Sequence, residues 1–334
     1  RLLSRGLGDV YKRQGLPVST PAMTVNKVCG SSLKAIMVAA TAIRAGEHRC
    51  IVAGGMESMT NAPQLLMGQR RGTKMGDSTL VDSMIHDGLW DVYNDMHMGN
   101  TGEVVSEEFS ITREGMDAFA AQSQQRAATA QAEGWFTWET VPVQVPQRRG
   151  GPVTVLADEG VRADTTAEGL ARLQPVFDRE GKVTAGNAST LNDGAAAVLV
   201  ADADLAAEMG WDVIAEIVDQ TTSGVAPERV MAAPIPAVRT LLERQELDVL
   251  DVDVYEHNEA FAAASCAVAQ DLGIPNDRFN LHGGAVSLGH PLGASGARCL
   301  ITMIGAMRRI DAKSGIVTLC LGGGNAVAML VRRP

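Results

Sequence analysis

The chain has 334 residues and a formal net charge of −10, which argues against nucleic acid or an anionic membrane as its main partner. Apolar residues make up 46% of it, aromatic residues only 4%, and there are 35 glycines. This composition favours an α/β protein of closely packed layers, and no apolar run reaches the roughly 18 residues that a membrane span needs.

The cysteines are sparse, odd in number and without the spacing of a metal site; they are Cys29, Cys50, Cys266, Cys299 and Cys320. Such cysteines are typical of reduced thiols, so we expect no disulfide framework, no metal and a cytoplasmic protein. Residues 1–14 are basic and aperiodic and begin without methionine. We interpret them as non-native, and expect the true N-terminus, with any targeting signal, to lie outside this sequence.

The first organised stretch covers residues 25–32, where Cys29 lies among small residues directly before a predicted helix over 33–44. The free N–H groups at a helix start favour a thiolate over a thiol and can bind a developing oxyanion. Cys29 therefore fits a nucleophile, but it fits a small buried hydrophobic residue equally well. A short buried strand over 49–53 is expected next, ending at Gly54 and Gly55.

The middle of the chain, from about residue 56 to 186, interrupts the α/β pattern. A clear helix is predicted over 113–133 and a proline-limited edge strand over 141–146, so we interpret this region as an inserted subdomain. Strands and helices then alternate. The predicted strands cover 195–201, 213–218, 252–256, 315–320 and 326–331, and the predicted helices cover 202–209, 235–244, a segment ending at 272, and 294–309. A glycine-rich loop over 282–291 precedes the last helix.

Two parts of the chain share one pattern. A small-residue loop, a helix, a strand and a Gly-Gly ending occur at 29–55 and again at 289–324, which indicates two related halves. Cys29, His290 and Cys320 each lie beside glycines at a junction between a loop and a regular element, and Asn258 opens a helix. Together these four residues predict a shared site.

Four segments resemble the signature blocks of the thiolases; they are VNKVCGSSLKAI (25–36), HNEAFA (257–262), GGAVSLGHPLGASGAR (283–298) and CLGGG (320–324). MHMG (96–99) and VTAGNASTLNDGAAAV (183–198) are similar to further blocks of that family. The resemblance implies a layered αβαβα fold of two similar halves, each with a mixed five-stranded sheet, and an inserted loop domain. We expect the first half at 1–61 and 192–212, the inserted coenzyme A-binding domain at 62–191, and the second half at 213–334.

The resemblance also implies a reaction: reversible Claisen condensation of two acetyl-CoA molecules to acetoacetyl-CoA and CoA. Cys29 would carry the acyl group as a thioester and His290 would take its proton. Cys320 would be the acid/base at the α-carbon. Asn258 would hold a water that forms one oxyanion site with His290, and the backbone N–H groups of Cys29 and Gly322 would form the other.

Coenzyme A would be bound as a substrate, with no permanently bound cofactor. The family pattern places nine residues around it: Leu89, His97, Met98, Arg162, Ala185, Ser189, Ala260, Phe261 and Leu292. Arg162 would contact the phosphate or adenine end and Ser189 would hydrogen-bond the pantetheine. Family members form homodimers or homotetramers, and the resemblance implies the same here.

The sequence departs from the family pattern at Ser32 and Thr190, where glycine is usual, and at His257, where an aliphatic residue is common. Only 28 residues precede Cys29, so the first half is expected to lack much of its sheet and the fragment to be poorly stable. Three alternatives stay open: a 3-ketoacyl-CoA thiolase of fatty-acid degradation, a ketoacyl synthase, and a CoA-binding fragment without turnover. The second cysteine and Asn258 argue against the synthase. No glycine run has the GxGxxG arrangement of a dinucleotide site.

Overall fold

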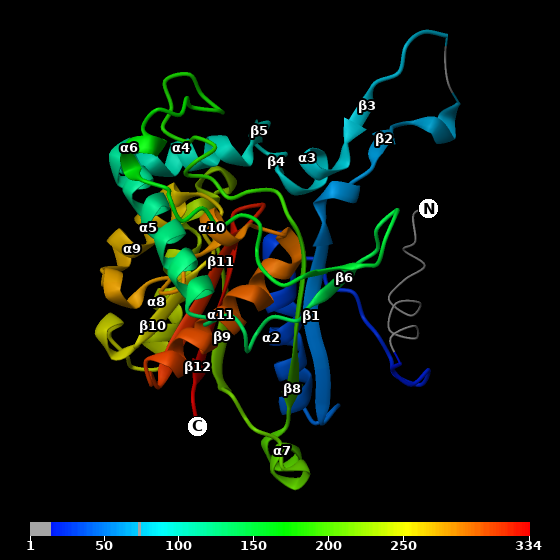
Figure 1. Ribbon diagram of the computed structural model, residues 1–334, viewed down its shortest axis with the longest axis vertical. Helices are drawn as coiled ribbons and strands as arrows, with labels where there is room; N and C mark the ends of the chain where they lie inside the picture. Colours follow the sequence, from blue (N-terminus) through cyan, green and yellow to red (C-terminus); the bar gives the residue numbers. More distant parts are fainter. Residues whose placement is uncertain (1–14, 73–74) are drawn as a thin grey trace.

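A computed structural model describes residues 15–72 and 75–334. The largest sheet of this part has four strands in the order β10–β11–β12–β9 (Figure 1). Only β10 and β11 run parallel; the other neighbours are antiparallel. The four strands are β9 (Glu216–Gly224), β10 (Val254–His257), β11 (Ser314–Leu321) and β12 (Asn325–Arg332). All of β11 is buried, as expected of a strand covered on both faces.

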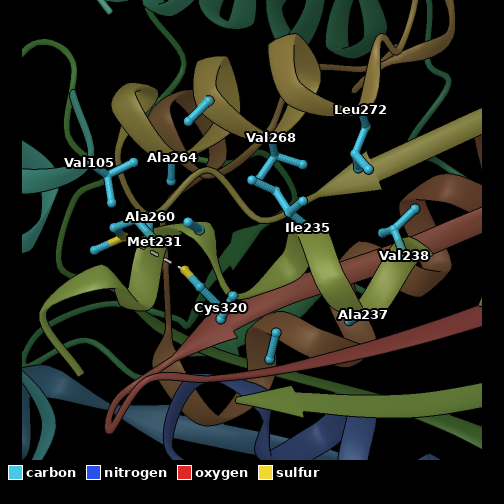
Figure 2. Packing of buried hydrophobic residues seen from close by; sticks show 14 of the residues in the cluster. Val105, Met231, Ile235, Ala237, Val238, Ala260, Ala264, Val268, Leu272 and Cys320 are labelled. Atoms are coloured by element: carbon cyan, nitrogen blue, oxygen red, sulfur yellow. Dashed lines mark hydrogen bonds between the residues drawn. The ribbon is translucent and has the colours of Figure 1, made fainter. Parts of the chain in front are cut away.

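The alternation of side chains along β11 divides the interior into two cores. Ile316 and Cys320 face the first core, which contains α8 (Pro234–Arg244) and α9 (Ala262–Leu272). Figure 2 shows Cys320 in this core beneath apolar side chains of these two helices. Val317 and Leu319 face the second core, which contains α2 (Ser31–Arg44) and α11 (Ser295–Arg309). The sheet therefore has helices on both faces.

The second sheet that joins distant segments is the antiparallel pair of β1 (Cys50–Ser58) and β8 (Asp193–Ala201). Helices α2 and α11 contact this pair on one side and the four-stranded sheet on the other. The predicted mixed α/β layering is thus confirmed. The layers are α8 and α9, then the four-stranded sheet, then α2 and α11, and finally the pair of β1 and β8. The expectation of five strands in each half is not met by the described residues, in which the sheets have four and two strands.

Residues 59–192 lie between the two strands of the pair. Their described elements are β2 (Gln64–Leu66), β3 (Leu80–Asp82), α3 (Ser83–Gly88), β4 (Trp90–Asp91), β5 (Met96–His97), α4 (Met98–Glu108), α5 (Arg113–Ala132), β6 (Val143–Val145), β7 (Val153–Val155) and α6 (Ala167–Leu170). Helices α4 and α5 pack against α9, so this segment covers the first core. None of the helices in the described part of the chain is long and apolar enough to cross a bilayer.

The predicted helices over 33–44, 113–133, 235–244 and 294–309 are confirmed to within two residues, and α7 (Ala203–Met209) matches the helix expected there. Three other predictions need correction. The strand expected over 213–218 is β9, which begins at Glu216 and continues to Gly224 because its polar residues pair with β12. The segment over 141–146 contributes only β6, paired with β7. The glycine-rich loop contains the short helix α10 (Ala285–Leu288).

The prediction that the first strand ends at Gly54 and Gly55 is wrong, because β1 continues to Ser58. The glycines are needed for close packing. A Cβ on Gly55 would lie 2.0 Å from the carbonyl oxygen of Gly293, and one on Gly54 would lie 2.1 Å from that of Ala196. Glycine inside a strand can mark such a close approach of two backbones.

Helices α2 and α11 also approach closely. A Cβ on Gly296 would lie 2.6 Å from the backbone nitrogen of Leu33. Beside this contact, Ser32 Oγ accepts a hydrogen bond from the backbone N–H of Ala297 at 2.8 Å. The departure from glycine at Ser32 therefore adds a hydrogen bond between the helix that follows Cys29 and the helix that follows His290.

We expect Gly296→Ala to lower the free energy of unfolding by about 1–3 kcal/mol, because the new methyl group meets backbone that has no room to move. Urea unfolding followed by circular dichroism measures this. Gly115→Ala is the matched control, since Gly115 also lies in the first turn of a helix but its Cβ would come no closer than 3.4 Å to Thr112 Oγ1. Equal destabilisation by both changes would contradict the packing argument.

Candidate active site

Cys29 lies in a tight turn, the 3-10 helix η1 (Val28–Gly30), directly before α2. Val28 has a positive φ of 47°. Local hydrogen bonds hold this conformation: Asn26 Oδ1 accepts from the Val28 N–H at 3.0 Å, and Ser31 Oγ donates to the Val28 carbonyl at 2.6 Å. Cys29 is partly buried. The sequence around it thus builds a rigid turn that presents one thiol.

The Cys29 sulfur lies among backbone donors. Hydrogen bonds from the N–H groups of Cys29 itself and of Gly322 lower its pKa, as expected at a helix start. Burial outweighs them, Glu57 adds in the same direction, and the pKa rises to about 12. The predicted effect of the local N–H groups is therefore present, but burial outweighs it, and Cys29 is a neutral thiol in the free site.

His290 is buried at the end of the glycine-rich loop. Its Nε2 lies 3.3 Å from Asn258 Nδ2, and its Nδ1 lies 2.5 Å from Ser295 Oγ. Its backbone N–H donates to Asn192 Oδ1 at 3.2 Å. Burial, assisted by the positive charge of Arg298, lowers the pKa of His290 to about 3. The imidazole is therefore neutral at physiological pH.

Asn258 follows the last residue of β10 and is fully buried. Its backbone N–H donates to the carbonyl oxygen of Thr318 on β11 at 3.1 Å, so the neighbouring strand sets its position. The side-chain amide extends from this point to His290 and, on the other side, to Cys299.

Cys320 is buried near the end of β11, with its sulfur 3.7 Å from Met231 Sδ (Figure 2). Burial raises the pKa of Cys320, and a negative charge on the neighbouring Cys29 sulfur would raise it further. The turn η1 contacts both β11 and the 3-10 helix η7 (Leu292–Ala294) that follows His290. The fold thus joins Cys29, Cys320 and Gly322 on one side to His290 and Asn258 on the other.

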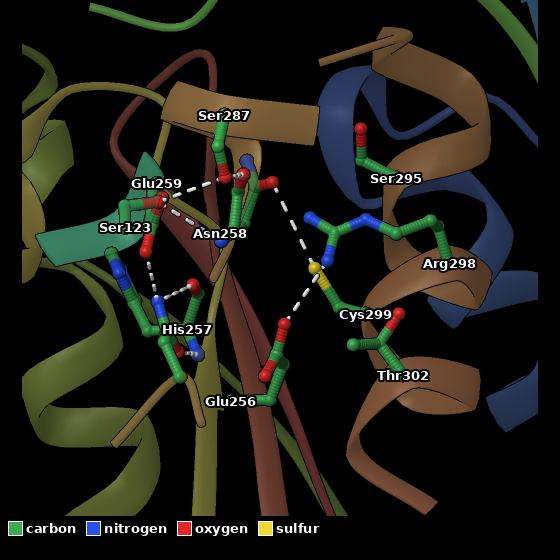
Figure 3. Close-up of polar contacts among 12 residues, drawn as sticks. Ser123, Glu256, His257, Asn258, Glu259, Ser287, Ser295, Arg298, Cys299 and Thr302 are labelled. Carbon is green, nitrogen blue, oxygen red and sulfur yellow. Dashed lines mark hydrogen bonds and ion pairs between the residues drawn. The ribbon is translucent and has the colours of Figure 1, made fainter. Parts of the chain in front are cut away.

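Glu259 organises the loop that carries His290. Its buried carboxylate accepts hydrogen bonds from Ser123 Oγ at 2.6 Å, Asn280 Nδ2 at 2.8 Å and the Val286 N–H at 3.1 Å (Figure 3). A Cβ on Gly284 would lie 2.4 Å from this carboxyl group. Glycine is therefore required at that position of the loop.

The residues expected around coenzyme A fall into two sets. Seven are connected by contacts between their own segments; they are Leu89, His97, Met98, Ser189, Ala260, Phe261 and Leu292. The Met98 N–H donates to the Leu89 carbonyl at 2.8 Å and the Ser189 N–H donates to the Ala260 carbonyl at 3.1 Å. His97 stacks on Phe177 at 4.7 Å, and Phe177 meets Phe261 edge-on.

Leu292 approaches this set from η7, because a Cβ on Gly88, next to Leu89, would lie 2.9 Å from its side chain. The other two residues, Arg162 and Ala185, have exposed side chains outside these contacts. The backbone N–H of Arg162 donates to Gln124 Oε1 at 2.7 Å, and Gln124 Nε2 donates to the Val286 carbonyl at 3.2 Å. The Arg162 segment is therefore anchored beside α10.

Sequence reasoning missed four residues that contact the site: Asn192, Glu259, Ser295 and Cys299. Ser295 and Glu259 lie inside the blocks GHPLGASGAR and HNEAFA, so their closeness in sequence to His290 and Asn258 could have predicted that they contact the site. Asn192 and Cys299 carry no comparable local signal. Thr190, one of the departures from glycine, has its own partner, because its hydroxyl donates to Asn192 Oδ1 at 2.7 Å.

Comparison with known proteins gives a consistent result. A family model described as the thiolase N-terminal domain matches residues 9–204, and one described as the thiolase C-terminal domain matches residues 211–333. Acetyl-CoA acetyltransferases of Cupriavidus necator and Pseudomonas aeruginosa are each 50% identical over 100% of this chain and 86% of their own length. A crystal structure of human mitochondrial 3-ketoacyl-CoA thiolase superposes with a TM-score of 0.94 at 38% identity, covering 98% of this chain and 82% of that one.

We expect the rate at which iodoacetamide alkylates Cys29 to rise about tenfold per pH unit from pH 7 to 10 without a plateau, because the thiolate is the reactive form and the pKa is about 12. Peptide mass spectrometry measures the adduct, and the Cys29→Ala variant identifies its peptide. A plateau already at neutral pH would reveal a thiolate–imidazolium pair with His290 and contradict the neutral site.

Proposed function

The chain belongs to the thiolase family, and from this membership we propose that it is an acetyl-CoA C-acetyltransferase, which condenses two acetyl-CoA molecules to acetoacetyl-CoA and CoA and catalyses the reverse thiolysis. The observation that carries the proposal is the pair of neighbouring thiols, Cys29 and Cys320, beside a neutral His290. This chemistry needs one sulfur that holds the acyl group and a second group that moves a proton.

In the first half-reaction, the Cys29 sulfur attacks the carbonyl carbon of acetyl-CoA and its proton passes to His290 Nε2. The bond from that carbon to the CoA sulfur breaks, and Cys320 protonates the leaving sulfur. Attack and proton transfer occur together, because neither a Cys29 thiolate nor a His290 imidazolium is favoured in the free site. The N–H groups of Cys29 and Gly322, which converge on the sulfur, are assigned to the oxyanion of the acyl group.

In the second half-reaction, the Cys320 thiolate takes a proton from the α-carbon of a second acetyl-CoA. The enolate attacks the acyl carbon on Cys29, which releases acetoacetyl-CoA and the Cys29 sulfur. That sulfur recovers its proton from His290. We assign His290, with a water held by Asn258, to the oxygen of the enolate, because a thioester α-carbon is too weakly acidic to react without such stabilisation.

Coenzyme A is assigned to the seven connected residues from Leu89 to Leu292, with Arg162 at the phosphate or adenine end. A crystal structure of human mitochondrial 3-ketoacyl-CoA thiolase in complex with CoA superposes on this chain with a TM-score of 0.93 at 37% identity, which supports an acyl-CoA substrate. We also propose a homodimer or homotetramer located in the cytoplasm. The predicted domain boundaries, at residues 61, 191 and 212, stay a prediction.

The alternative functions have less support. The acetyl-CoA acetyltransferases of Cupriavidus necator and Pseudomonas aeruginosa share 50% identity with this chain, which favours the two-carbon acyl group. A ketoacyl synthase would not need the second thiol. A CoA-binding fragment without turnover would not need the neighbouring Cys29, His290 and Cys320 that this chain keeps.

We expect the intact protein to gain one acetyl group within seconds of mixing with acetyl-CoA, and Cys29→Ala to gain none. Cys320→Ala still becomes acetylated on Cys29, but more slowly because the leaving CoA sulfur loses its proton donor, and it condenses roughly 10²–10⁴-fold more slowly because the proton at the α-carbon loses its acceptor. Intact mass spectrometry and a coupled condensation assay measure the two effects. A wild-type protein that is folded by circular dichroism but never acetylated would establish the CoA-binding reading instead.

The substrate assignment predicts a preference for short chains. We expect kcat/KM for thiolysis of acetoacetyl-CoA to exceed that for 3-ketohexadecanoyl-CoA by roughly tenfold or more, because an enzyme that forms acetoacetyl-CoA discriminates by differential binding of the short acyl group in the transition state. Steady-state thiolysis followed at the absorbance of the ketoacyl-CoA measures this ratio. A ratio below one would favour the fatty-acid degrading enzyme.

A further inference from the structure

One face of α11 presents two side chains to the buried His290–Asn258 pair. Ser295 and Cys299 are one helical turn apart, so their side chains lie on the same face. Ser295 Oγ contacts His290 Nδ1 at 2.5 Å. Cys299 Sγ contacts Asn258 Oδ1 at 3.8 Å, and Figure 3 shows Ser295 and Cys299 on the same helix. Both residues are fully buried. Neither has a role in the reaction described above.

The hydrogen bonds of Ser295 favour one position for the proton of His290. Ser295 Oγ is also 2.9 Å from the carbonyl oxygen of Pro291, which only accepts, so the hydroxyl hydrogen is directed to that carbonyl. The oxygen of Ser295 is then an acceptor toward His290, and Nδ1 carries the hydrogen. Because the imidazole is neutral, its Nε2 has a free lone pair.

The contacts of Asn258 agree with this assignment. A bare Nε2 needs a donor, and the amide nitrogen of Asn258 lies 3.3 Å from it. The amide oxygen then points to Cys299, whose S–H is a weak donor. The Pro291 carbonyl also accepts the backbone N–H groups of Ala294 and Ser295. The opposite tautomer would place the Ser295 oxygen 2.9 Å from that carbonyl oxygen with no hydrogen between them, and would require the Asn258 amide to turn its donor toward Cys299.

We propose that Ser295 and Cys299 are positioning residues that fix one direction of hydrogen bonding, from Cys299 through Asn258 and His290 to Ser295 and the Pro291 carbonyl, and thereby keep His290 Nε2 ready to accept a proton. This inference rests on the proposed function, because Nε2 is the atom that receives the Cys29 proton. The helix that follows His290 in the chain thus selects the tautomer that the acyl transfer requires.

The test compares single-turnover acetylation of Cys29 by excess acetyl-CoA in the full chain. Ser295→Ala is expected to slow acetylation roughly 10–100-fold, since a buried N–H loses its acceptor and the other tautomer is populated. Ser265→Ala is the matched control. Ser265 Oγ contacts Nδ1 of a second buried histidine, His257, at 2.9 Å, so this change also removes a serine–histidine hydrogen bond, yet acetylation should stay within about twofold of wild type.

The variants of Cys299 test the other end of the chain of hydrogen bonds. Cys299→Ala removes the donor to Asn258 Oδ1 and is expected to slow acetylation roughly threefold, whereas Cys299→Ser keeps a donor and should restore the wild-type rate. This pair decides the proposal even if Ser295→Ala does not fold. Equal rates for alanine and serine at position 299, with normal acetylation of Ser295→Ala where it folds, would overturn it.

A spectroscopic measurement separates positioning from general stability. In protein labelled with ¹⁵N-histidine, the two nitrogens of His290 should show a protonated Nδ1 and a bare Nε2, with the His290→Asn variant identifying the signals. Ser295→Ala should mix the two tautomers and Ser265→Ala should not. A protonated Nε2 in the wild-type protein would overturn the inference. A wild-type protein that folds but is never acetylated would instead refute the proposed function, and the tautomer measurement would still stand.

Discussion

A buried carboxylate, that of Glu259, is the contact on which the site depends. Removing a carboxylate from water is costly, so it is tolerated only where donors surround it. Here the donors come from α5, from Asn280 and from the loop that ends at His290. Burial raises the pKa of Glu259, and these three bonds oppose that rise. The same bonds fix the loop, and they set His290 beside Asn258, the residue next to Glu259 in the chain.

The alternation of side chains in β11 links the core to the chemistry. Ile316 and Cys320 face one core, while Val317 and Leu319 face the other. Any shift of register would exchange the two sets. Because β11 is buried on both faces, its register places the Cys320 side chain against Met231. It also places the backbone N–H of Gly322, just beyond the strand, within hydrogen-bonding distance of the Cys29 sulfur. The position of the second thiol follows from packing.

Burial also sets the charge state of the site. Donors at the start of α2 favour a thiolate on Cys29, and a thiolate would favour an imidazolium on His290. Removal of both groups from water opposes this and prevails, so the free site holds a neutral thiol and a neutral imidazole. In such a site the direction of hydrogen bonds, rather than fixed charge, prepares His290 to accept a proton, which gives Ser295 its importance.

Local pattern was sufficient for the strongly periodic elements and for a prediction of the reactive groups. The helices of 33–44, 113–133, 235–244 and 294–309 follow from residues three and four apart, and the blocks around Cys29, His290 and Cys320 are continuous in sequence. The true end of β1 was not predictable, because Gly55 reads as a strand end until its contact with Gly293, far along the chain, is known.

The sequence by itself therefore determined the family to which the chain belongs and where most helices begin and end, and it predicted which residues carry the chemistry. Only the tertiary structure decided their protonation, their hydrogen-bond direction and their supporting partners. The physical reason is that these properties arise between distant segments. Ser123 and Glu259 are 136 residues apart and Cys299 and Asn258 are 41 apart. The burial that raises the pKa of Cys29 exists only once α2 and α11 have packed together.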